Sequence, residues 1–518
     1  MSEEYTVPNK WLVAFTVMTP TFMVVLDTSV ANVSLTHIQG SLSAGLEEVT
    51  WVLTSYLTAN AIVLPMTAWF ASVFGRKRFL MICVAGFTIS SFLCGVAPSL
   101  VFLIVCRVMQ GVFGGGMQPM SQAILLESFP RKQHGTAMAF YGMGIITAPI
   151  FGPLIGGYIT DHASWRWIFY INVPVGVLSA LLVLMVVVDP PYIKREYAKF
   201  DLFGIVLLAV GIGSLQMVLD KGNQQDWFNS RFIMALSVMA VVGLITLVWW
   251  ELFGTREPIV NLRVFKERSF ASGNLFLFLT FFGFFSSVVL LPLYLQKLMG
   301  YSAFQAGLVL GPGGAATVVM LPIAGIMTQK GHARTILLFG IIFAASSIYL
   351  MSGFNLQADF RAVIKPRILQ GFAMSFFFIP LTTLTMAQIP KEQMGNATGL
   401  YNLMRNVGSS FGVAVSSTLL ARRTQFHQFR LIEQVNSFDP NVRNALETFS
   451  KYLFLHGTPF SLAQKTALAG FYGQALKQSM MLAFNDTFFV MFIATLSVTP
   501  LIFLFRKAEA GSPEKGAY

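Results

Sequence analysis

Apolar stretches of about 20 residues recur along the chain, and this repetition restricts the possible folds more than any other feature. A helix of that length spans the hydrocarbon core of a bilayer, and only helices and closed barrels satisfy their backbone hydrogen bonds there. Charged residues make up 11% of the chain, whereas a soluble domain carries roughly 25%. The sequence therefore predicts an all-α integral membrane protein that crosses the bilayer many times.

We predict fourteen membrane spans from the apolar stretches. They are 11–35, 49–71, 79–97, 100–126, 136–160, 168–188, 201–220, 231–253, 270–296, 304–328, 334–353, 362–388, 396–420 and 480–505. The first is too long for a secretory signal and lacks a small-residue cleavage site. We therefore expect it to remain in the protein as the first membrane helix.

Lysine and arginine are distributed unevenly between the two sets of alternating short loops. One set contains Gly75, Arg76, Lys77 and Arg78, and also Arg131, Lys132, Lys194, Arg195, Lys199, Arg256, Arg263, Lys266, Arg268, Lys330, Arg334 and Lys391. Because cytoplasmic loops are enriched in these residues, we predict that both termini lie in the cytoplasm. The segment 421–479 is then a long, partly helical loop on the outer side. It is either a solvated loop or a docking surface for another protein.

The chain contains an internal repeat with an offset of 260 residues. "RVMQG" at 107–111 recurs as "RILQG" at 367–371, and the further matches are Gly135 with Gly395, Ala137 with Ala397, Tyr141 with Tyr401, Phe151 with Phe411, and Gly152 with Gly412. Two six-helix units in the same orientation, separated by two extra helices, account for this offset. We predict a 6+2+6 arrangement, with an N-terminal bundle at 1–200, an inserted pair within 201–268 and a C-terminal bundle at 269–518.

Several function classes are disfavoured by the sequence. The net charge of +12 has no clustered basic face on a soluble domain, so we expect it to set topology and not to bind nucleic acid. Cys83, Cys94 and Cys106 lie in apolar segments without metal-type spacing, so we expect no metal site. The chain has no H-E-x-x-H, G-x-S-x-G or P-loop motif. We therefore expect neither an enzyme nor a cofactor.

Asp27 is the one carboxylate that we place deep inside a predicted span. A charge at that depth costs roughly 3 kcal/mol or more, so it needs a partner and a polar surrounding. At 1.5 Å per residue, Asp27 and Arg107 both lie about 10 to 15 Å from the outer face. A carboxylate whose surroundings change between conformations can take up and release a proton. We predict that Asp27 couples transport to protons with Arg107 as its partner; a fixed structural ion pair is the alternative.

Two further groups of residues are candidates for function. The span 136–160 contains closely spaced small residues and prolines, which favour close helix packing and indicate a hinge or seal: Gly144, Pro149, Gly152, Pro153, Gly156 and Gly157. Plain packing is the alternative for this group. The second group consists of polar side chains on spans that face each other, as candidates for coupling or for a substrate cavity: Arg405, Gln110, Gln118, Asn402 and Asn406.

Several of these segments match one known family. They are "LDTSVANVSL" at 26–35, "GRKR" at 75–78, "RVMQG" at 107–111, the glycine-proline span, "WRWIFYINVPVG" at 165–176 and "NLMRNVGSSFG" at 402–412. Through them the chain resembles the fourteen-span drug:proton antiporters of the major facilitator superfamily, especially the EmrB-like multidrug efflux pumps. The resemblance covers nearly the whole chain.

The resemblance implies proton-driven export of hydrophobic or amphipathic drugs across the bacterial inner membrane, with Asp27 and Arg107 at the coupling positions. Arg405 matches the family's arginine in the thirteenth span. The resemblance also implies a periplasmic membrane-fusion adaptor (EmrA-like) and, through it, an outer-membrane channel. Ser72 stands where the superfamily usually has an acidic residue, which puts the charge latch of the gating loop 75–78 in question. The alternative function is proton-coupled transport of one metabolite or solute by the same fold.

Overall fold

The described part of the protein is helical. The computed structural model describes residues 9–189, 201–255, 258–434 and 439–504, and these residues contain helices and no β-strand. Eleven helical stretches among them are long and apolar enough to cross a membrane, and one of these stretches, Gln305–Met351, contains two successive helices. All fourteen predicted spans fall on helices. The number of membrane crossings itself stays a prediction.

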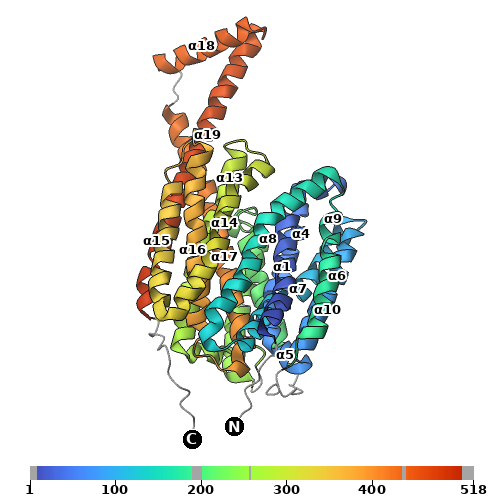
Figure 1. The fold of residues 1–518 in the computed structure, drawn as a ribbon. Coiled ribbons are helices and arrows are strands. Elements are labelled where there is room, and N and C mark those ends of the chain that lie inside the picture. The colour runs from blue at the N-terminus through green and yellow to red at the C-terminus, as the bar shows by residue number, and fades with distance from the viewer. Residues whose placement is uncertain (1–8, 190–200, 256–257, 435–438, 505–518) are drawn as a thin grey trace, which may run out of the picture.

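The first six predicted spans pack into one bundle (Figure 1). Its long helices are α1 (Lys10–Val33), α4 (Trp51–Val63), α6 (Arg76–Gly95), α7 (Leu100–Ser128), α8 (His134–His162) and α10 (Asn172–Val186). The shorter elements are α2 (Leu35–Ser41), α3 (Leu46–Val49), η1 (Leu64–Met66), α5 (Thr67–Phe74), η2 (Arg131–Gln133) and α9 (Trp167–Tyr170). Helix α1 packs against α7, α8 and α10. A charged side chain at the middle of α1 is therefore surrounded by protein and not by lipid.

Two helices follow this bundle, α11 (Leu202–Lys221) and α12 (Arg231–Trp249). They approach closely because Gly211 and Gly243 face each other; a Cβ atom on Gly243 would lie 3.0 Å from the Gly211 Cα atom. Small residues allow such contacts between membrane helices. Helix α11 also contacts α4 and α17 (Met394–Gln434), so the inserted pair contacts both bundles. The predicted domain boundary at residue 200 lies outside the described residues.

The last bundle contains the other predicted spans. Its long helices are α13 (Arg268–Lys297), α14 (Ala303–Met327), α15 (Ala333–Met351), α16 (Phe360–Met386), α17 and α19 (Phe460–Leu496), and its short elements include η5 (Leu262–Lys266), η6 (Thr328–His332), η7 (Lys391–Gln393) and η8 (Thr499–Leu504). Two further short elements belong to the inserted pair: η3 (Trp227–Asn229) lies between α11 and α12, and η4 (Trp250–Gly254) follows α12. Helix α16 packs against α13, α14 and α15, while α13 packs against α17. The packing around α16 thus resembles the packing around α7 in the first bundle.

Where we predicted a partly helical loop at 421–479, the described residues are largely helical and project from the bundle. Helix α17 continues without a break to Gln434, and α19 begins at Phe460, well before its predicted span. Together with α18 (Pro440–Leu455) these ends form an extension that rises above the bundle (Figure 1). Contacts between the helices stabilise the extension. Helix α18 packs on α19, where Phe449 lies against Gly470. Gln428 on α17 donates a 2.7 Å hydrogen bond to Tyr472 on α19.

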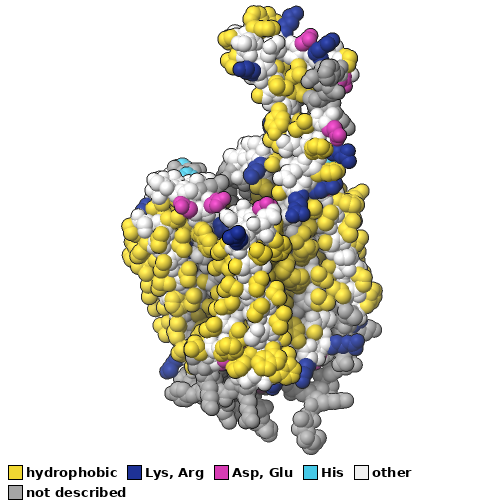
Figure 2. Space-filling model, turned by 180° about the vertical axis from the view of Figure 1, so that it is seen from behind, with side chains coloured by type: hydrophobic (Ala, Val, Ile, Leu, Met, Phe, Trp, Pro, Cys, Tyr) yellow, Lys and Arg dark blue, Asp and Glu magenta, His cyan; other side chains and the backbone are white. Residues whose placement is uncertain are grey.

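The surface divides into a central apolar belt and two polar ends. Figure 2 shows hydrophobic side chains over the middle of the bundle, with lysine and arginine side chains above and below them. The start of α1 and the end of α19 with η8 lie at the end opposite the extension (Figure 1). We call this end the predicted cytoplasmic end, because the loop Gly75–Arg78 also belongs to it. The arrangement matches a bundle that spans a bilayer.

Candidate functional site

A buried ion pair joins α1 to α7. The guanidinium of Arg107 lies 2.6 Å from the carboxylate of Asp27, measured between Nη1 and Oδ2. The two side chains are 0% and 1% exposed. The structure thus brings together the two residues that the depth argument paired. A pair so deeply buried is neutral as a whole, which reduces its cost inside the membrane.

The carboxylate of Asp27 is held by two further side chains. Gln110 Nε2 donates a 2.9 Å hydrogen bond to Oδ1, and Asn172 Nδ2 donates a 2.7 Å hydrogen bond to the same oxygen. Arg107 is held in turn, since its Nε donates to the Val52 carbonyl at 3.0 Å. Arg107 Nη1, Gln110 Nε2 and Asn172 Nδ2 all donate to the carboxylate oxygens of Asp27. Protonation of Asp27 would remove its charge and weaken contacts that reach α7 and α10 together.

Sequence reasoning missed Asn172 and Tyr56. Asn172 starts α10 and also donates a 3.0 Å hydrogen bond to Ser91 on α6. The Tyr56 ring lies under the guanidinium of Arg107, with 4.2 Å from the Arg107 Cζ atom to the ring centroid. The available signal for Asn172 was an amide at the start of an apolar span, within the stretch 165–176. Nothing local in the sequence linked Tyr56 to Arg107.

A second polar layer connects the two halves. Arg405 Nη2 on α17 donates a 2.6 Å hydrogen bond to Gln118 Oε1 on α7. Asn402 Nδ2 donates to Gln122 Oε1 at 2.8 Å between the same helices. Among the described contacts, Asn406 forms no such bond. The predicted candidates therefore separate: Gln110 belongs to the Asp27 site, whereas Arg405, Gln118 and Asn402 lie at the contact between the halves.

The halves are in contact at the predicted cytoplasmic end. Helix α8 meets α14 where Gly135 faces Gly325: a Cβ atom on Gly135 would lie 2.8 Å from the Gly325 carbonyl oxygen. On the other side, a Cβ atom on Gly399 of α17 would lie 2.8 Å from the Leu64 carbonyl oxygen. Both are close approaches of backbone to backbone, which only glycine permits. We call these two contacts the cytoplasmic seam; the structure has this end closed.

The glycine-proline segment packs on α1 beside the ion pair. Gly144 lies against Met18, Gly152 against Ser29, and a Cβ atom on Gly156 would lie 3.1 Å from Val30. The prediction of close packing is wrong for Gly157, where a Cβ atom would have nothing within 4 Å. Pro149 is exposed, and the side chain of Pro153 lies outside the described residues. A hinge role for α8 stays a prediction.

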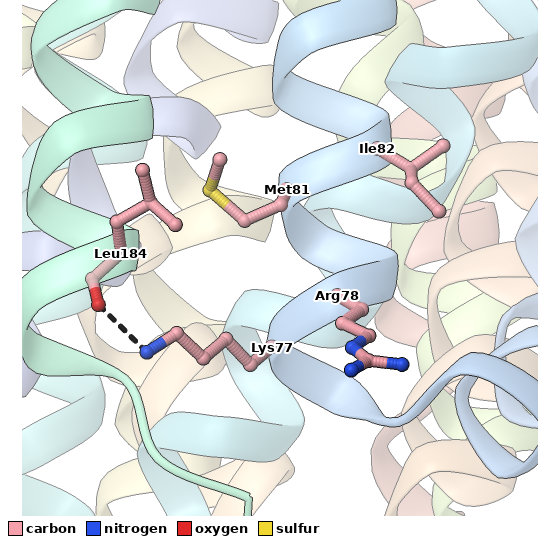
Figure 3. A pocket seen from close by; sticks show the side chains of 5 residues that line it. All are labelled: Lys77, Arg78, Met81, Ile82 and Leu184. Atoms are coloured by element: carbon pink, nitrogen blue, oxygen red, sulfur yellow. Dashed lines mark hydrogen bonds between the residues drawn. The ribbon is translucent and has the colours of Figure 1, made fainter.

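The predicted gating loop 75–78 is tied to its own half. Gly75 has φ of 82°, which glycine adopts most readily, and it ends α5 and starts α6. Arg76 forms an ion pair with Glu127 at the end of α7. Lys77 Nζ donates a 2.6 Å hydrogen bond to the Leu184 carbonyl, and Figure 3 shows it beside Arg78 at a cavity of about 420 Å³ between α6 and α10.

Ser72 does not take over the role of the missing acid. Its hydroxyl donates a 2.8 Å hydrogen bond to the Trp69 carbonyl of its own helix. Glu127 and the Leu184 carbonyl belong to the same half as the loop, as does Asp189, whose carboxylate accepts a 2.8 Å hydrogen bond from the Lys77 backbone. These three contacts of the loop therefore strengthen one half. A role of the loop in gating stays a prediction.

The repeated bundles, the seam between them and the buried ion pair define a polytopic membrane protein built as two halves in contact with each other. No group of three or more His, Cys, Asp or Glu side chains in the described ranges is arranged to hold a metal ion.

Comparisons with known proteins agree with this description. The model of the Major Facilitator Superfamily matches residues 17–413. The chain is 38% identical over 471 residues to the multidrug export protein EmrB of Escherichia coli (strain K12), covering 91% of this chain and 90% of that protein. It is 37% identical over 493 residues to the EmrB protein of Haemophilus influenzae, covering 95% and 94%. The chain therefore belongs to the major facilitator superfamily and is similar to its EmrB members.

A solved structure supports the fold. The crystal structure of the human organic anion transporter MFSD10 (TETRAN) superimposes with a TM-score of 0.60, covering 94% of this chain and 100% of that one, at 12% sequence identity. At that identity the likeness concerns the fold alone. The predicted major facilitator fold is thereby confirmed.

Proposed function

We propose that this protein is a proton-coupled antiporter that exports hydrophobic and amphipathic drugs by alternating access. The observation that carries the proposal is the buried carboxylate of Asp27, held by Arg107, Gln110 and Asn172 from two other helices. The names of the EmrB relatives support drug export over transport of a single metabolite. Protons drive the cycle, and no cofactor takes part.

The proposed cycle depends on the charge of Asp27. While the carboxylate is ionised, its bonds hold α1 against α7 and α10, and the cytoplasmic seam is closed. Proton uptake from outside neutralises Asp27, weakens these bonds and lets the halves rock so that the seam opens. Release of the proton to the cytoplasm restores the ion pair. The drug competes with the proton for the transition between the closed and open states of the seam, and it is carried in the direction opposite to the proton.

The orientation and location belong to the same proposal. We place both termini in the cytoplasm and the protein in the bacterial inner membrane. The basic loop Gly75–Arg78 and the start of α1 lie at one end, while the extension 421–479 lies at the other. Cytoplasmic ends carry more lysine and arginine in short loops. The extension is then periplasmic.

Proton flux in proteoliposomes tests the function directly. Purified protein is reconstituted with a pH indicator in the lumen and an imposed pH gradient, and several unrelated lipophilic cations and weak acids are added in turn. We expect several compounds to dissipate the gradient, and protein-free liposomes with the same compounds provide the control. A response to a single compound would favour the narrow carrier, and no response to any of them would contradict antiport.

We further propose that the extension docks a periplasmic membrane-fusion adaptor, which would connect the pump to an outer-membrane channel. Large apolar side chains point outward there: Phe429 is 70% exposed, Leu455 72%, Phe460 62% and Leu468 59%. The extension that carries them rises above the bundle (Figure 1) and above the apolar belt of Figure 2, where no bilayer would cover it. Exposed apolar patches outside a membrane mark contact sites for proteins.

Charged substitutions on the extension test the docking. We expect the double variant Leu455→Asp with Phe460→Asp to lose most adaptor binding, since both residues are exposed and the change places charge in an apolar contact. Binding of a purified EmrA-type adaptor is measured by surface plasmon resonance. Gln464→Asp, at an exposed polar position of α19, is the matched control. Equal adaptor affinity in all three proteins would contradict the docking surface.

A further inference from the structure

The internal repeat places a second, altered copy of the Asp27 site in the last bundle. At the offset of 260 residues, Asp27 corresponds to Ser287, Arg107 to Arg367 and Gln110 to Gln370. The contacts are repeated as well. Arg367 Nη1 donates to Gln370 Oε1, as Arg107 donates to Gln110, and Gln370 Nε2 donates a 2.7 Å hydrogen bond to Ser287 Oγ. The copy keeps the arginine and the glutamine, but a hydroxyl replaces the carboxylate.

Arg367 consequently lacks a counter-charge. Within the residues that the structure describes, it forms no ion pair with a carboxylate, and its buried Nε atom has no hydrogen-bond acceptor. Arg367 is the eighth residue of α16, about 10 Å along that helix from its first residue. The cost of a membrane cation is reduced by a partner of opposite charge. The site in the last bundle is therefore suited to receive an anion.

A second cation lies in the same bundle. Arg405 on α17 has an uncharged partner, Gln118, and interacts electrostatically with Tyr141 and Tyr401. No described carboxylate pairs with it. In the first bundle the charge of Arg107 is balanced by Asp27, whereas Arg367 and Arg405 in the last bundle form no described ion pair with a carboxylate. The field around these two arginines attracts anions and repels cations.

We propose that Arg367, Gln370 and Ser287 form a binding site for the carboxylate of an amphipathic anion. A ligand carboxylate at Ser287 would occupy the position that the Asp27 side chain holds in the first bundle. Guanidinium groups bind carboxylates through paired, charge-assisted hydrogen bonds. This inference rests on the proposed function, because the ligand would be the exported compound. It narrows the substrates to organic anions with an apolar body.

The chain offers a direct test, since Ser287→Asp restores the missing carboxylate. We expect this variant to form its own ion pair with Arg367 and so to exclude the ligand. The probes are 4-phenylbutyrate and 4-phenylbutylamine, which share an apolar body and differ in the sign of their charge. Equilibrium binding of each to purified protein is measured by isothermal titration calorimetry, without a gradient, so that failure of transport does not affect the result.

The affinities expected for the two probes distinguish binding at this site from a general effect of the substitutions on the protein. The unaltered protein should bind 4-phenylbutyrate at least tenfold more tightly than 4-phenylbutylamine. Arg367→Gln and Ser287→Asp should each weaken 4-phenylbutyrate binding at least tenfold, and Ser287→Asn should retain it within about threefold. Lys365→Gln, which removes an exposed cation two residues away on α16, should also retain it. A wild-type affinity for 4-phenylbutyrate in a folded Ser287→Asp variant, or equal binding of both probes, would overturn the proposal, even if drug-driven proton flux were observed.

Discussion

Replacement of Asp27 by asparagine is expected to abolish proton-driven drug export, down to the level of protein-free liposomes. Asparagine has nearly the same shape as aspartate and can still accept hydrogen bonds from Gln110 and Asn172, so the helices should stay together. The asparagine amide does not take up a proton near neutral pH, and it is uncharged, so it cannot form the ion pair with Arg107. The variant therefore loses the one step that couples the two substrates, while the bundle remains folded.

The measurement combines two assays on the same proteoliposomes. Drug movement driven by an imposed pH gradient should disappear in Asp27→Asn, whereas exchange of labelled for unlabelled drug without a gradient should persist. Asp486→Asn is the control, because Asp486 is a half-exposed acid that pairs with Arg423 and His427 at the base of the extension. Gradient-driven export by Asp27→Asn at the normal rate would rule out Asp27 as the coupling group.

Replacement of Gly325 by valine is expected to prevent closure of the cytoplasmic seam and to stop transport. A Cβ atom at this position would lie 3.0 Å from the Gly135 carbonyl oxygen and 3.1 Å from the Ala139 Cβ atom. Backbone cannot yield as a flexible side chain can, and overpacking typically costs about 1 to 3 kcal/mol. That cost falls only on the closed state, which shifts the populations toward the open state by roughly 5- to 150-fold.

Distances between spin labels report on the seam. Labels at Lys132→Cys and Lys330→Cys, both exposed and close to the ends of α8 and α14, should move apart in the Gly325→Val protein. Gly311→Val is the matched control, since Gly311 lies on the same helix and a Cβ atom there has nothing within 4 Å. An unchanged distance distribution together with normal transport would show that this close approach is not needed for closure.

Much of the fold could be predicted because the bilayer allows few structures. Each apolar stretch of about 20 residues has to be a helix in lipid, and all fourteen predicted stretches fall on helices. The segment 421–479 was predicted only as a partly helical loop, and its helix boundaries could not be predicted for the complementary reason. Outside the membrane a mixed polar and apolar sequence is restricted by its packing partners, and the partner of α18 is α19, which the local sequence does not indicate.

The pairing of Asp27 with Arg107 could be predicted from depth alone, since few charged residues lie at that level of the membrane. The full site could not. Asn172 is separated from Asp27 by 145 residues, and its rotation about α10 decides whether its amide meets the carboxylate. The repeat, in contrast, was visible in the sequence, and its offset pairs Asp27 with Ser287. Only the structure shows that Arg367, Gln370 and Ser287 also repeat the bonds of the first site.

The sequence by itself determined the class of fold, the duplication of the halves and the level at which a lone acid sits, because hydrophobic length and charge depend only on the order of residues. The tertiary structure decided which side chains meet at that level, which of the two repeated sites has a balanced charge, and which end of the bundle is closed. Those properties depend on the rotation and close approach of helices. The backbone contact between Gly135 and Gly325, for example, closes one end of the bundle, and no pattern along the chain predicts it.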